Sequence, residues 1–286
     1  MRVTVLGGDG MLGHRLLVQL GERHQVRVTL RRKLADYASF GLFDAGNADD
    51  CVDVRDFAAV RAAIEAFRPQ AVINAVGVVK QRSDANDRRL SVEINALLPH
   101  RLAELCATIG ARLIHVSTDC VFSGRRGMYS EDDPCDAEDV YGRSKWLGEL
   151  DSAPAITLRT SIIGRELSRK TGLLEWFLAQ QQPIRGYRRA IFSGFTTIEL
   201  TRIIERMLHV PDAQCGLYQV SSDPISKYDL LNLIALAFGK TIRIEPDDDF
   251  VCDRSLDSTR FRRLFGYQPP SWPQMVAEMA ARDERG

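Results

Sequence analysis

The 286-residue sequence has no excess of charge of either sign, because 38 Lys and Arg residues stand against 38 Asp and Glu residues. A protein that binds nucleic acid through phosphate neutralisation needs a basic excess or stripe, so this balance argues against that class. Long hydrophobic runs are also missing. The run Gln70–Val79 falls well short of the roughly 20 apolar residues that a membrane-spanning helix needs. Neither nucleic acid nor a membrane is expected as a partner.

Cysteine patterns typical of metal sites and disulfide frameworks are absent as well. The six cysteines are scattered, with no C-x-x-C pair and no pair of histidines nearby, so no metal site is expected. A chain of this length does not need a disulfide framework, and its N-terminus leads straight into an apolar strand rather than a signal peptide. We therefore expect reduced thiols and a cytoplasmic protein.

Apolar runs of strand length alternate with helical patterns over the first half, which predicts βαβ units and a doubly wound parallel sheet of the Rossmann type. The expected strands are Arg2–Leu6, Val26–Leu30, Cys51–Val54, Ala71–Val76, Leu113–Ser117 and Ile156–Arg159. The expected helices between them are Met11–Leu20, Phe57–Phe67, Val92–Ile109 and Tyr141–Leu150.

After Arg159 the regular alternation of strand and helix patterns ends. A helix (197–208), a strand (217–220) and a second helix (227–238) are expected there. We predict a dinucleotide-binding domain over residues 1–165 and a smaller, mainly substrate-binding C-terminal lobe over residues 166–286. A segment of that lobe, about residues 195–221, is expected to return to the main sheet.

Three glycines, Gly7, Gly10 and Gly13, follow the first strand and open the first helix. This spacing lets the backbone turn tightly, so that its N–H groups and the helix N-terminus, with Met11 and Leu12, can approach a pyrophosphate. A plain glycine-rich turn is the alternative. The strand, turn and helix lie in the order that a dinucleotide site requires, which favours the cofactor interpretation.

The end of the second strand indicates which dinucleotide is bound. An NAD site usually places Asp or Glu there to bind the ribose 2′-hydroxyl, whereas this chain has Arg31 and Arg32. Because Arg can hold a phosphate with two hydrogen bonds, NADP(H) is preferred over NAD(H). A solvated basic loop is the alternative. After the third strand, Asp53 and Val54 are expected at the adenine, with Asp56 as a helix N-cap in the other interpretation.

Tyr141 and Lys145 are four residues apart and share one face of a predicted helix. A nearby ammonium favours the phenolate and makes the tyrosine a better acid–base group near neutral pH. The pair follows Thr118, at the carboxyl end of a strand where open α/β sheets bind ligands. Thr118 can hydrogen-bond the substrate oxygen that Tyr141 protonates.

Together with the segments 117–124 and 158–161, these motifs resemble the extended short-chain dehydrogenase/reductases, in particular the dTDP-4-dehydrorhamnose reductases and similar nucleotide-sugar 4-ketoreductases. The resemblance covers most of residues 1–165 and is looser beyond them. It implies a catalytic Thr118, Tyr141 and Lys145, with NADPH-dependent reduction of a 4-keto nucleotide sugar for deoxysugar or polysaccharide precursors. Further cofactor contacts are expected from Ala75, Val76, Gly77, Asn95, Lys145 and Ser161. Substrate contacts are expected from Lys80, Thr118, Asp119, Tyr141, Arg189 and Arg254.

Several alternatives stay open. Asn95 is either part of a proton relay or a helix residue that bonds backbone, and the arginines are alternatively salt-bridge partners. Dehydratases of the superfamily carry Thr-Asp-Glu, whereas here Cys120 follows Asp119, which disfavours water elimination. Epimerase or epimerase–reductase activity is the enzymatic alternative, and a reductase-like regulatory subunit that binds NADP(H) is the non-enzymatic one. The sequence leaves the sugar and the oligomeric state open, with a homodimer as one expectation.

Overall fold

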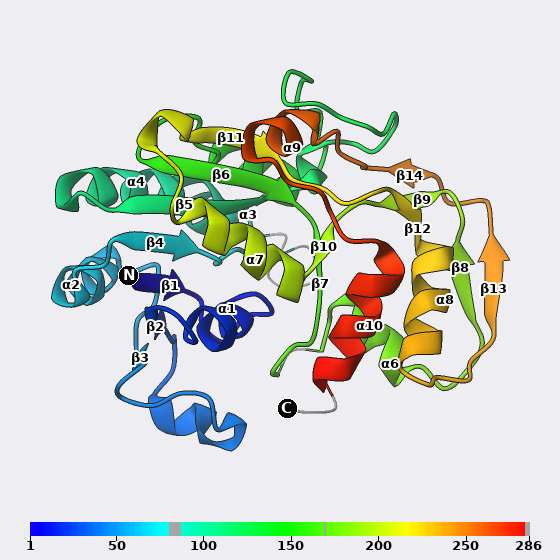
Figure 1. The fold of residues 1–286 in the computed structure, drawn as a ribbon, viewed down its shortest axis with the longest axis horizontal. Coiled ribbons are helices and arrows are strands. Elements are labelled where there is room, and N and C mark those ends of the chain that lie inside the picture. Colours follow the sequence, from blue (N-terminus) through cyan, green and yellow to red (C-terminus); the bar gives the residue numbers. More distant parts are fainter. Residues whose placement is uncertain (80–86, 169, 284–286) are drawn as a thin grey trace. The chain divides into compact units, whose positions relative to one another are not determined.

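The computed structural model describes residues 1–79, 87–168 and 170–283. Its main feature is a seven-stranded sheet with the strand order β11-β6-β5-β4-β1-β2-β3 (Figure 1). The pairs from β5 across to β3 are parallel. The strands are β1 (Arg2–Leu6), β2 (Gln25–Thr29), β3 (Ala48–Asp49), β4 (Ala71–Asn74), β5 (Arg112–Thr118), β6 (Ala155–Thr160) and β11 (Gly216–Gln219). The predicted Rossmann-type sheet is confirmed.

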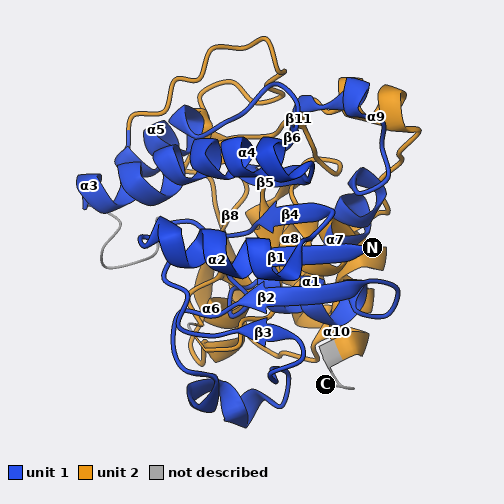
Figure 2. Ribbon diagram, turned by 90° about the vertical axis from the view of Figure 1, so that its left-hand side faces the viewer, with its two compact units in different colours: residues 1–117, 139–158, 201–217 blue, residues 118–138, 159–200, 218–286 orange. Residues whose placement is uncertain are grey.

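Helices cover both faces of this sheet. Helix α1 (Gly13–Leu20) lies on one side, and α2 (Phe57–Phe67) and α4 (Leu98–Ile109) lie on the other (Figure 2). All four residues of β4 are buried, as expected for a parallel strand covered on both faces. The core on the α2 and α4 side contains Ile64 and Leu102, both fully buried. Helix α2 begins where predicted because the Asp56 carboxylate accepts hydrogen bonds from the N–H groups of residues 58 and 59.

The expected third strand over residues 51–54 is wrong. The strand at the edge of the sheet is β3, three residues earlier, and it pairs with Val28 and Thr29 of β2. Cys51 has a φ of 55°, a left-handed conformation that turns the chain out of the ladder. Val52 is nevertheless buried in the core beneath α2. The apolar signal in this segment therefore came from packing against a helix and not from strand pairing.

The long helix expected over 92–109 is interrupted. It comprises α3 (Arg88–Ser91), a π-helical turn η2 (Val92–Leu97) and α4. In η2 the N–H of Leu98 bonds the carbonyl of Glu93, five residues back. Pro99 follows directly and lacks the N–H that would bond Asn95 in a regular helix. The chain at Gly148 packs closely against this turn, since a Cβ on Gly148 would lie 1.9 Å from the Asn95 carbonyl oxygen.

The chain divides into two compact units, each made from three segments (Figure 2). Unit 1 contains residues 1–117, 139–158 and 201–217, and unit 2 contains residues 118–138, 159–200 and 218–286. Unit 1 also holds η1 (Leu34–Phe40), α5 (Val140–Leu147), η4 (Asp212–Gln214) and most of α7 (Thr197–Met207). Because these units interleave along the chain, the predicted domain division near residue 165 stays a prediction.

Unit 2 is built from short strands and helices. Its strands form three small sheets, β7 with β10, β12-β9-β14, and β8 with β13. They are β7 (Ile162–Ile163), β8 (Ile184–Tyr187), β9 (Ala190–Phe192), β10 (Phe195–Thr196), β12 (Ile225–Ser226), β13 (Ile244–Asp247) and β14 (Cys252–Asp253). The remaining elements are η3 (Asp119–Val121), α6 (Leu173–Ala179), α8 (Lys227–Ala237), α9 (Thr259–Phe265) and α10 (Trp272–Asp283). Most of these were not predicted, because segments of two to seven residues carry little periodicity.

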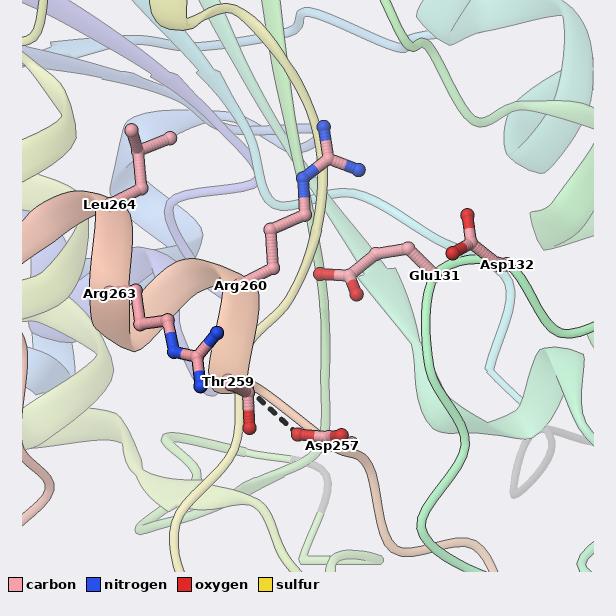
Figure 3. A pocket seen from close by; sticks show the side chains of 7 residues that line it. All are labelled: Glu131, Asp132, Asp257, Thr259, Arg260, Arg263 and Leu264. Carbon is pink, nitrogen blue, oxygen red and sulfur yellow. Dashed lines mark hydrogen bonds between the residues drawn. The ribbon is translucent and has the colours of Figure 1, made fainter.

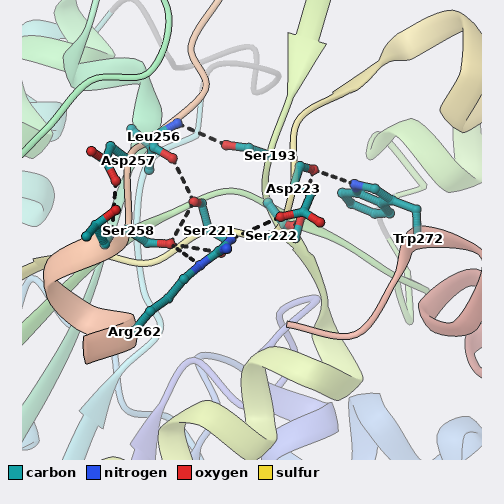
Figure 4. A network of polar contacts seen from close by, with 11 residues as sticks. Ser193, Ser221, Ser222, Asp223, Leu256, Asp257, Ser258, Arg262 and Trp272 are labelled. Atoms are coloured by element: carbon teal, nitrogen blue, oxygen red, sulfur yellow. Dashed lines mark hydrogen bonds and ion pairs between the residues drawn. The ribbon is translucent and has the colours of Figure 1, made fainter. Parts of the chain in front are cut away.

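A polar network holds the loops of unit 2 together (Figure 4). Arg262 of α9 donates from Nε to the Ser258 hydroxyl at 2.9 Å and from Nη2 to the Ser221 carbonyl at 3.1 Å. The Ser221 hydroxyl in turn donates to the Leu256 carbonyl at 2.8 Å. The indole of Trp272 donates to the Asp223 carbonyl at 2.7 Å. The network thus joins the chain after β11 to the starts of α9 and α10.

Among residues 1–79, 87–168 and 170–283, no helix combines the length and the apolar character needed to cross a bilayer.

Candidate active site

The glycine-rich turn of unit 1 connects β1 to α1 by close backbone packing. Gly7 has a φ of 86°, a left-handed conformation that suits glycine. A Cβ on Gly13 would lie 1.9 Å from the Gly7 carbonyl oxygen, and one on Gly10 would lie 3.2 Å from it. Met11 and Leu12 follow at the start of α1. The turn therefore has the shape that a pyrophosphate needs in order to approach backbone N–H groups.

The segment after β2 carries the two predicted arginines on the surface. Both Arg31 and Arg32 are exposed. The Arg32 guanidinium carbon lies 4.9 Å from the centre of the Tyr37 ring. The charge of Arg31 contributes to holding the pKa of the Asp53 carboxyl below its usual value, although hydrogen bonds from Arg55 are the main cause. Two cationic side chains are thus exposed in the segment that follows β2.

The Asp53 carboxylate is already engaged within its own turn. It accepts hydrogen bonds from Arg55, the shortest of them 2.6 Å long and from Nη2. Val54 packs against the core of the α2 side. The N-cap alternative for Asp56 is confirmed, and the predicted role of Asp53 at the adenine stays a prediction.

The loop after β4 is fixed by Asn95. The Asn95 amide accepts from the N–H of Val78 at 2.9 Å and donates to its carbonyl at 3.1 Å. The same amide donates to the Ser144 hydroxyl of α5 at 3.0 Å. Gly77 approaches so closely that its Cβ would lie 3.3 Å from the Asn95 Oδ1 atom. Asn95 therefore bonds backbone, as the alternative interpretation expected, and sets the path of the loop containing Ala75 and Val76.

Helix α5 carries Tyr141 and Lys145. Asp139 caps this helix by accepting from the N–H of Gly142 at 2.7 Å, which starts the helix just before Tyr141. Lys145 is buried, with 4% of its surface exposed, and its Nζ donates to the Val116 carbonyl of β5 at 2.8 Å. Burial lowers the pKa of Lys145 to about 8. Tyr141 is partly exposed one turn earlier on the same helix.

His115 is buried beside this lysine, in the middle of β5. Its Nδ1 lies 3.2 Å from the Asn74 amide nitrogen, and the amide is the donor in this pair. Burial, with the charges of Lys145 and His100, holds the pKa of His115 well below its usual value. His115 is therefore a histidine of the core, and its burial favours the neutral imidazole.

Four predicted residues of unit 2 lie close together around Asp119. The Thr118 hydroxyl donates to the Asp119 carboxylate at 3.2 Å and accepts from the Cys120 N–H at 3.1 Å. Burial raises the pKa of Asp119, while the charge of Arg254 and hydrogen bonds from Cys120, Ser161 and Thr118 oppose that rise. Arg254 donates from Nε to the Phe122 carbonyl at 2.8 Å. Thr118, Asp119, Ser161 and Arg254 thus form one polar group.

Of the other predicted substrate residues, Tyr141 lies on α5 and Arg189 is not part of this group. Arg189 is exposed at the turn between β8 and β9. Lys80 lies outside the described residues.

A separate cavity of about 600 Å³ opens on unit 2 (Figure 3). It is lined by acidic and basic side chains with one leucine: Glu131, Asp132, Asp257, Thr259, Arg260, Arg263 and Leu264. The Glu131 carboxylate, which accepts from the N–H of Gln219 at 2.9 Å, points into it. Burial raises the pKa of Glu131. None of the predicted site residues that the structure describes lines this cavity.

Sequence reasoning missed three groups at the site. These are Asp9, Tyr37 and Glu149, whose carboxylate accepts from the Ser117 hydroxyl at 2.7 Å. Glu149 lies four residues after Lys145 on the chain, so helical spacing was a signal for its contribution. Tyr37 falls in a stretch to which no element was assigned, and its contacts gave no signal along the sequence.

Comparison with known proteins places the chain among reductases. Residues 1–170 match the family described as the RmlD substrate binding domain. The chain is 26% identical over 313 residues to a dTDP-4-dehydrorhamnose reductase of Aggregatibacter actinomycetemcomitans, and this match covers 99% of both chains.

Solved structures with the same fold include two nucleotide-bound enzymes. A dTDP-4-dehydrorhamnose reductase from Bacillus anthracis in complex with NADP has a TM-score of 0.79 and 21% identity, covering 98% of this chain and 99% of that one. The Bordetella bronchiseptica enzyme WbmG in complex with NAD and UDP has a TM-score of 0.79 and 19% identity, covering 100% and 95%. At these identities the likeness establishes the fold.

Proposed function

The chain belongs to the family of the RmlD substrate binding domain, and from this membership we propose that it reduces the 4-keto group of a nucleotide-linked sugar with a nicotinamide cofactor. The resemblance drawn from the sequence motifs is confirmed by that membership. One observation carries the proposal further: the buried Lys145 ammonium lies at the carboxyl end of β5, one helical turn from Tyr141. A structural helix has no need of a buried cation at this place, whereas reduction needs one to tune the phenol.

The residues present fit a dinucleotide. The turn leaves no room for a Cβ at Gly7 or Gly13 and little at Gly10, and it would receive the pyrophosphate. The cofactor, when bound, supplies a hydride. On the protein side we propose contacts from Met11, Leu12, Asp53, Val54, Ala75, Val76, Gly77, Asn95, Lys145 and Ser161. Arg31 and Arg32 would hold a 2′-phosphate, which supports NADP(H) over NAD(H).

Three residues are proposed to carry out the proton transfer of the reaction. Tyr141 donates a proton to the sugar oxygen as that oxygen gains negative charge. The Lys145 ammonium favours the phenolate that this transfer leaves behind, and Thr118 polarises the keto group before transfer. Reduction requires one proton and one hydride, so these groups suffice without a further acid or base.

The substrate assignment rests on the polar group of unit 2. Asp119 is an acceptor for a sugar hydroxyl, and Arg254 offers a guanidinium to a diphosphate. Arg189 is proposed as a further substrate contact, and Lys80, which lies outside the described residues, stays the substrate contact expected from the sequence. The cytoplasmic location expected from the sequence stays a prediction. The homodimer expected from the sequence stays a prediction that sedimentation velocity would test.

Epimerisation is the second candidate, because Thr118, Tyr141 and Lys145 also suffice for transient oxidation and return of the hydride. Dehydration is disfavoured because burial raises the pKa of the Cys120 thiol to about 12, so that it cannot replace a carboxylate as a base. A regulatory subunit would bind NADP(H) and turn over no substrate.

The test is oxidation of NADPH by the purified protein with a panel of 4-keto nucleotide sugars. Reduction predicts stoichiometric NADPH consumption with at least one sugar, and Tyr141→Phe should lower turnover by about 100-fold or more. Tyr228→Phe, on α8 of unit 2, is the matched control and should keep wild-type turnover. If the protein binds NADPH tightly but no sugar causes NADPH oxidation, the result would support the regulatory subunit. If a sugar product forms without net oxidation of NADPH, the result would support the epimerase.

A further inference from the structure

Tyr37 ties the glycine-rich turn to the segment after β2. Its side chain is buried in η1, with 1% of its surface exposed, and its ring packs edge-on against Phe43 with the ring centres 5.7 Å apart. The hydroxyl is used twice. It accepts from the N–H of Arg32 at 3.3 Å and donates to the Asp9 carboxylate at 3.3 Å.

The ring of Tyr37 also supports the side chain of Arg32. The guanidinium carbon lies 4.9 Å from the ring centre, within the range of a cation–π contact. Arg32 is exposed, so its long side chain would otherwise sample many rotamers. Stacking on a buried ring limits that freedom and presents the guanidinium before a ligand arrives.

Asp9 presents an electrostatic problem for a phosphorylated ligand. It lies within the glycine-rich turn, between Gly7 and Gly10, on the stretch of backbone that would receive the pyrophosphate. A carboxylate near an adenosine ribose accepts from a free 2′-hydroxyl but repels a 2′-phosphate. Here the Tyr37 hydroxyl occupies one carboxylate oxygen of Asp9, and the Arg32 charge lies near enough to Asp9 to interact with it.

We propose that Tyr37 is a positioning residue that determines the specificity of this nucleotide site. It makes the site accept adenosine that carries a 2′-phosphate. The ring holds the Arg32 guanidinium where a 2′-phosphate would meet it, and the hydroxyl keeps the Asp9 carboxylate turned away from that phosphate. The inference rests on the proposed function, since it assumes that the glycine-rich turn binds a dinucleotide. It differs from that function in assigning the choice of nucleotide to a buried tyrosine.

Two small probes test the site by calorimetry without turnover: adenosine 2′,5′-bisphosphate and adenosine 5′-monophosphate, titrated into the whole protein. The wild-type protein should bind the bisphosphate more tightly. Tyr37→Phe keeps the ring and loses only the hydroxyl, so the affinity ratio of the two probes should fall by roughly 5-fold. Tyr37→Leu also loses the ring and should lower the ratio by roughly 10-fold or more.

A second substitution separates the two roles of Tyr37. If the hydroxyl acts by restraining the Asp9 carboxylate, adding Asp9→Asn to Tyr37→Phe removes the repulsion and should restore the wild-type ratio. Adding the same change to Tyr37→Leu should restore it only in part, because Arg32 remains unsupported. Tyr228→Phe is the matched control and should leave both affinities unchanged.

The outcomes separate this inference from the proposed function. If the wild-type protein binds both probes and neither Tyr37→Phe nor Tyr37→Leu changes their affinity ratio, the proposed role of Tyr37 is overturned. The dinucleotide site is not contradicted by that result. Binding of neither probe by the wild-type protein overturns the dinucleotide site and this inference with it. If Tyr37→Leu does not fold, Tyr37→Phe decides alone, because it preserves the buried ring.

Discussion

The Lys145 ammonium donates a hydrogen bond of 2.8 Å to the Val116 carbonyl, and this contact joins α5 to the carboxyl end of β5. A lysine with only 4% of its surface exposed loses most of its hydration, which lowers its pKa from 10.5 to about 8. The protein therefore keeps a destabilised charge at the place where the proposed chemistry needs one.

The first prediction concerns the pH dependence of stability. The folded pKa of Lys145 lies below the unfolded one, so between pH 8 and 10.5 the unfolded chain binds more protons and the free energy of unfolding rises with pH. The rise should amount to about 3 kcal/mol at most. Lys145→Met should abolish this rise and lower turnover by about 100-fold or more.

Urea denaturation at pH 7.5 and pH 10 checks this prediction. Lys240→Met is the matched control, because Lys240 also donates to a backbone carbonyl, that of Leu178, but is partly exposed. The control should keep the wild-type pH dependence. An unchanged pH dependence in Lys145→Met would contradict the assignment of the rise to this lysine.

The second prediction concerns Asn95, which is fully buried and makes three hydrogen bonds. Asn95→Ala leaves the N–H and carbonyl of Val78 unsatisfied, so the free energy of unfolding should fall by about 2–4 kcal/mol. Nucleotide affinity should fall too, since the loop after β4 loses its anchor. Asn232→Ala, an exposed asparagine that bonds the Tyr228 carbonyl, should cost less than about 1 kcal/mol. A loss below about 1 kcal/mol for Asn95→Ala would argue against the anchoring role.

The third prediction concerns Gly13. A Cβ at this position would lie 1.9 Å from the Gly7 carbonyl oxygen, so Gly13→Ala must displace the turn. Calorimetric titration with NADPH should show an affinity loss of about 10-fold or more, since displacement removes backbone N–H groups from the phosphate. Gly239→Ala has open space around the new Cβ but a φ of 62°. This control should lose about 1 kcal/mol of stability and no affinity.

The fourth prediction concerns the polar network of unit 2. Arg262→Ala removes donors from the Ser258 hydroxyl and the Ser221 carbonyl, and should lower the free energy of unfolding by about 1–3 kcal/mol. Its neighbour Arg263 is exposed, and Arg263→Ala should stay within about 0.5 kcal/mol of the wild type. Thermal denaturation of both variants checks the difference, and equal melting temperatures would refute it.

Periodicity and turn chemistry allowed most of the first half of the fold to be predicted. Strand β1 and helix α2 have the bounds expected from the sequence, because each has a regular apolar pattern and a clear boundary signal. The strand expected over residues 51–54 failed because a single buried valine, Val52, mimics a strand when seen only along the chain. The two- to four-residue strands of unit 2 depend on partners far away in sequence, which no local pattern records.

The candidate site likewise contains residues that local sequence patterns predicted and residues whose roles depend on distant contacts. The motifs predicted Tyr141, Lys145 and the three glycines of the turn, because their spacing carries the chemistry. The roles of Asn95 and Tyr37 depend on which atoms they meet. Asn95 contacts Val78, 17 residues earlier, and Tyr37 contacts Asp9, 28 residues earlier.

The sequence by itself determined the sheet with its alternating helices, the glycine-rich turn and the residue types available for reduction, since these follow from local patterns and fixed spacings. Only the tertiary structure decided which of those residues are buried, which share hydrogen bonds, and how far the pKa of Lys145 is lowered. Burial and electrostatic coupling depend on distances through space, and folding alone brings Val116 to Lys145 and Asp9 to Tyr37.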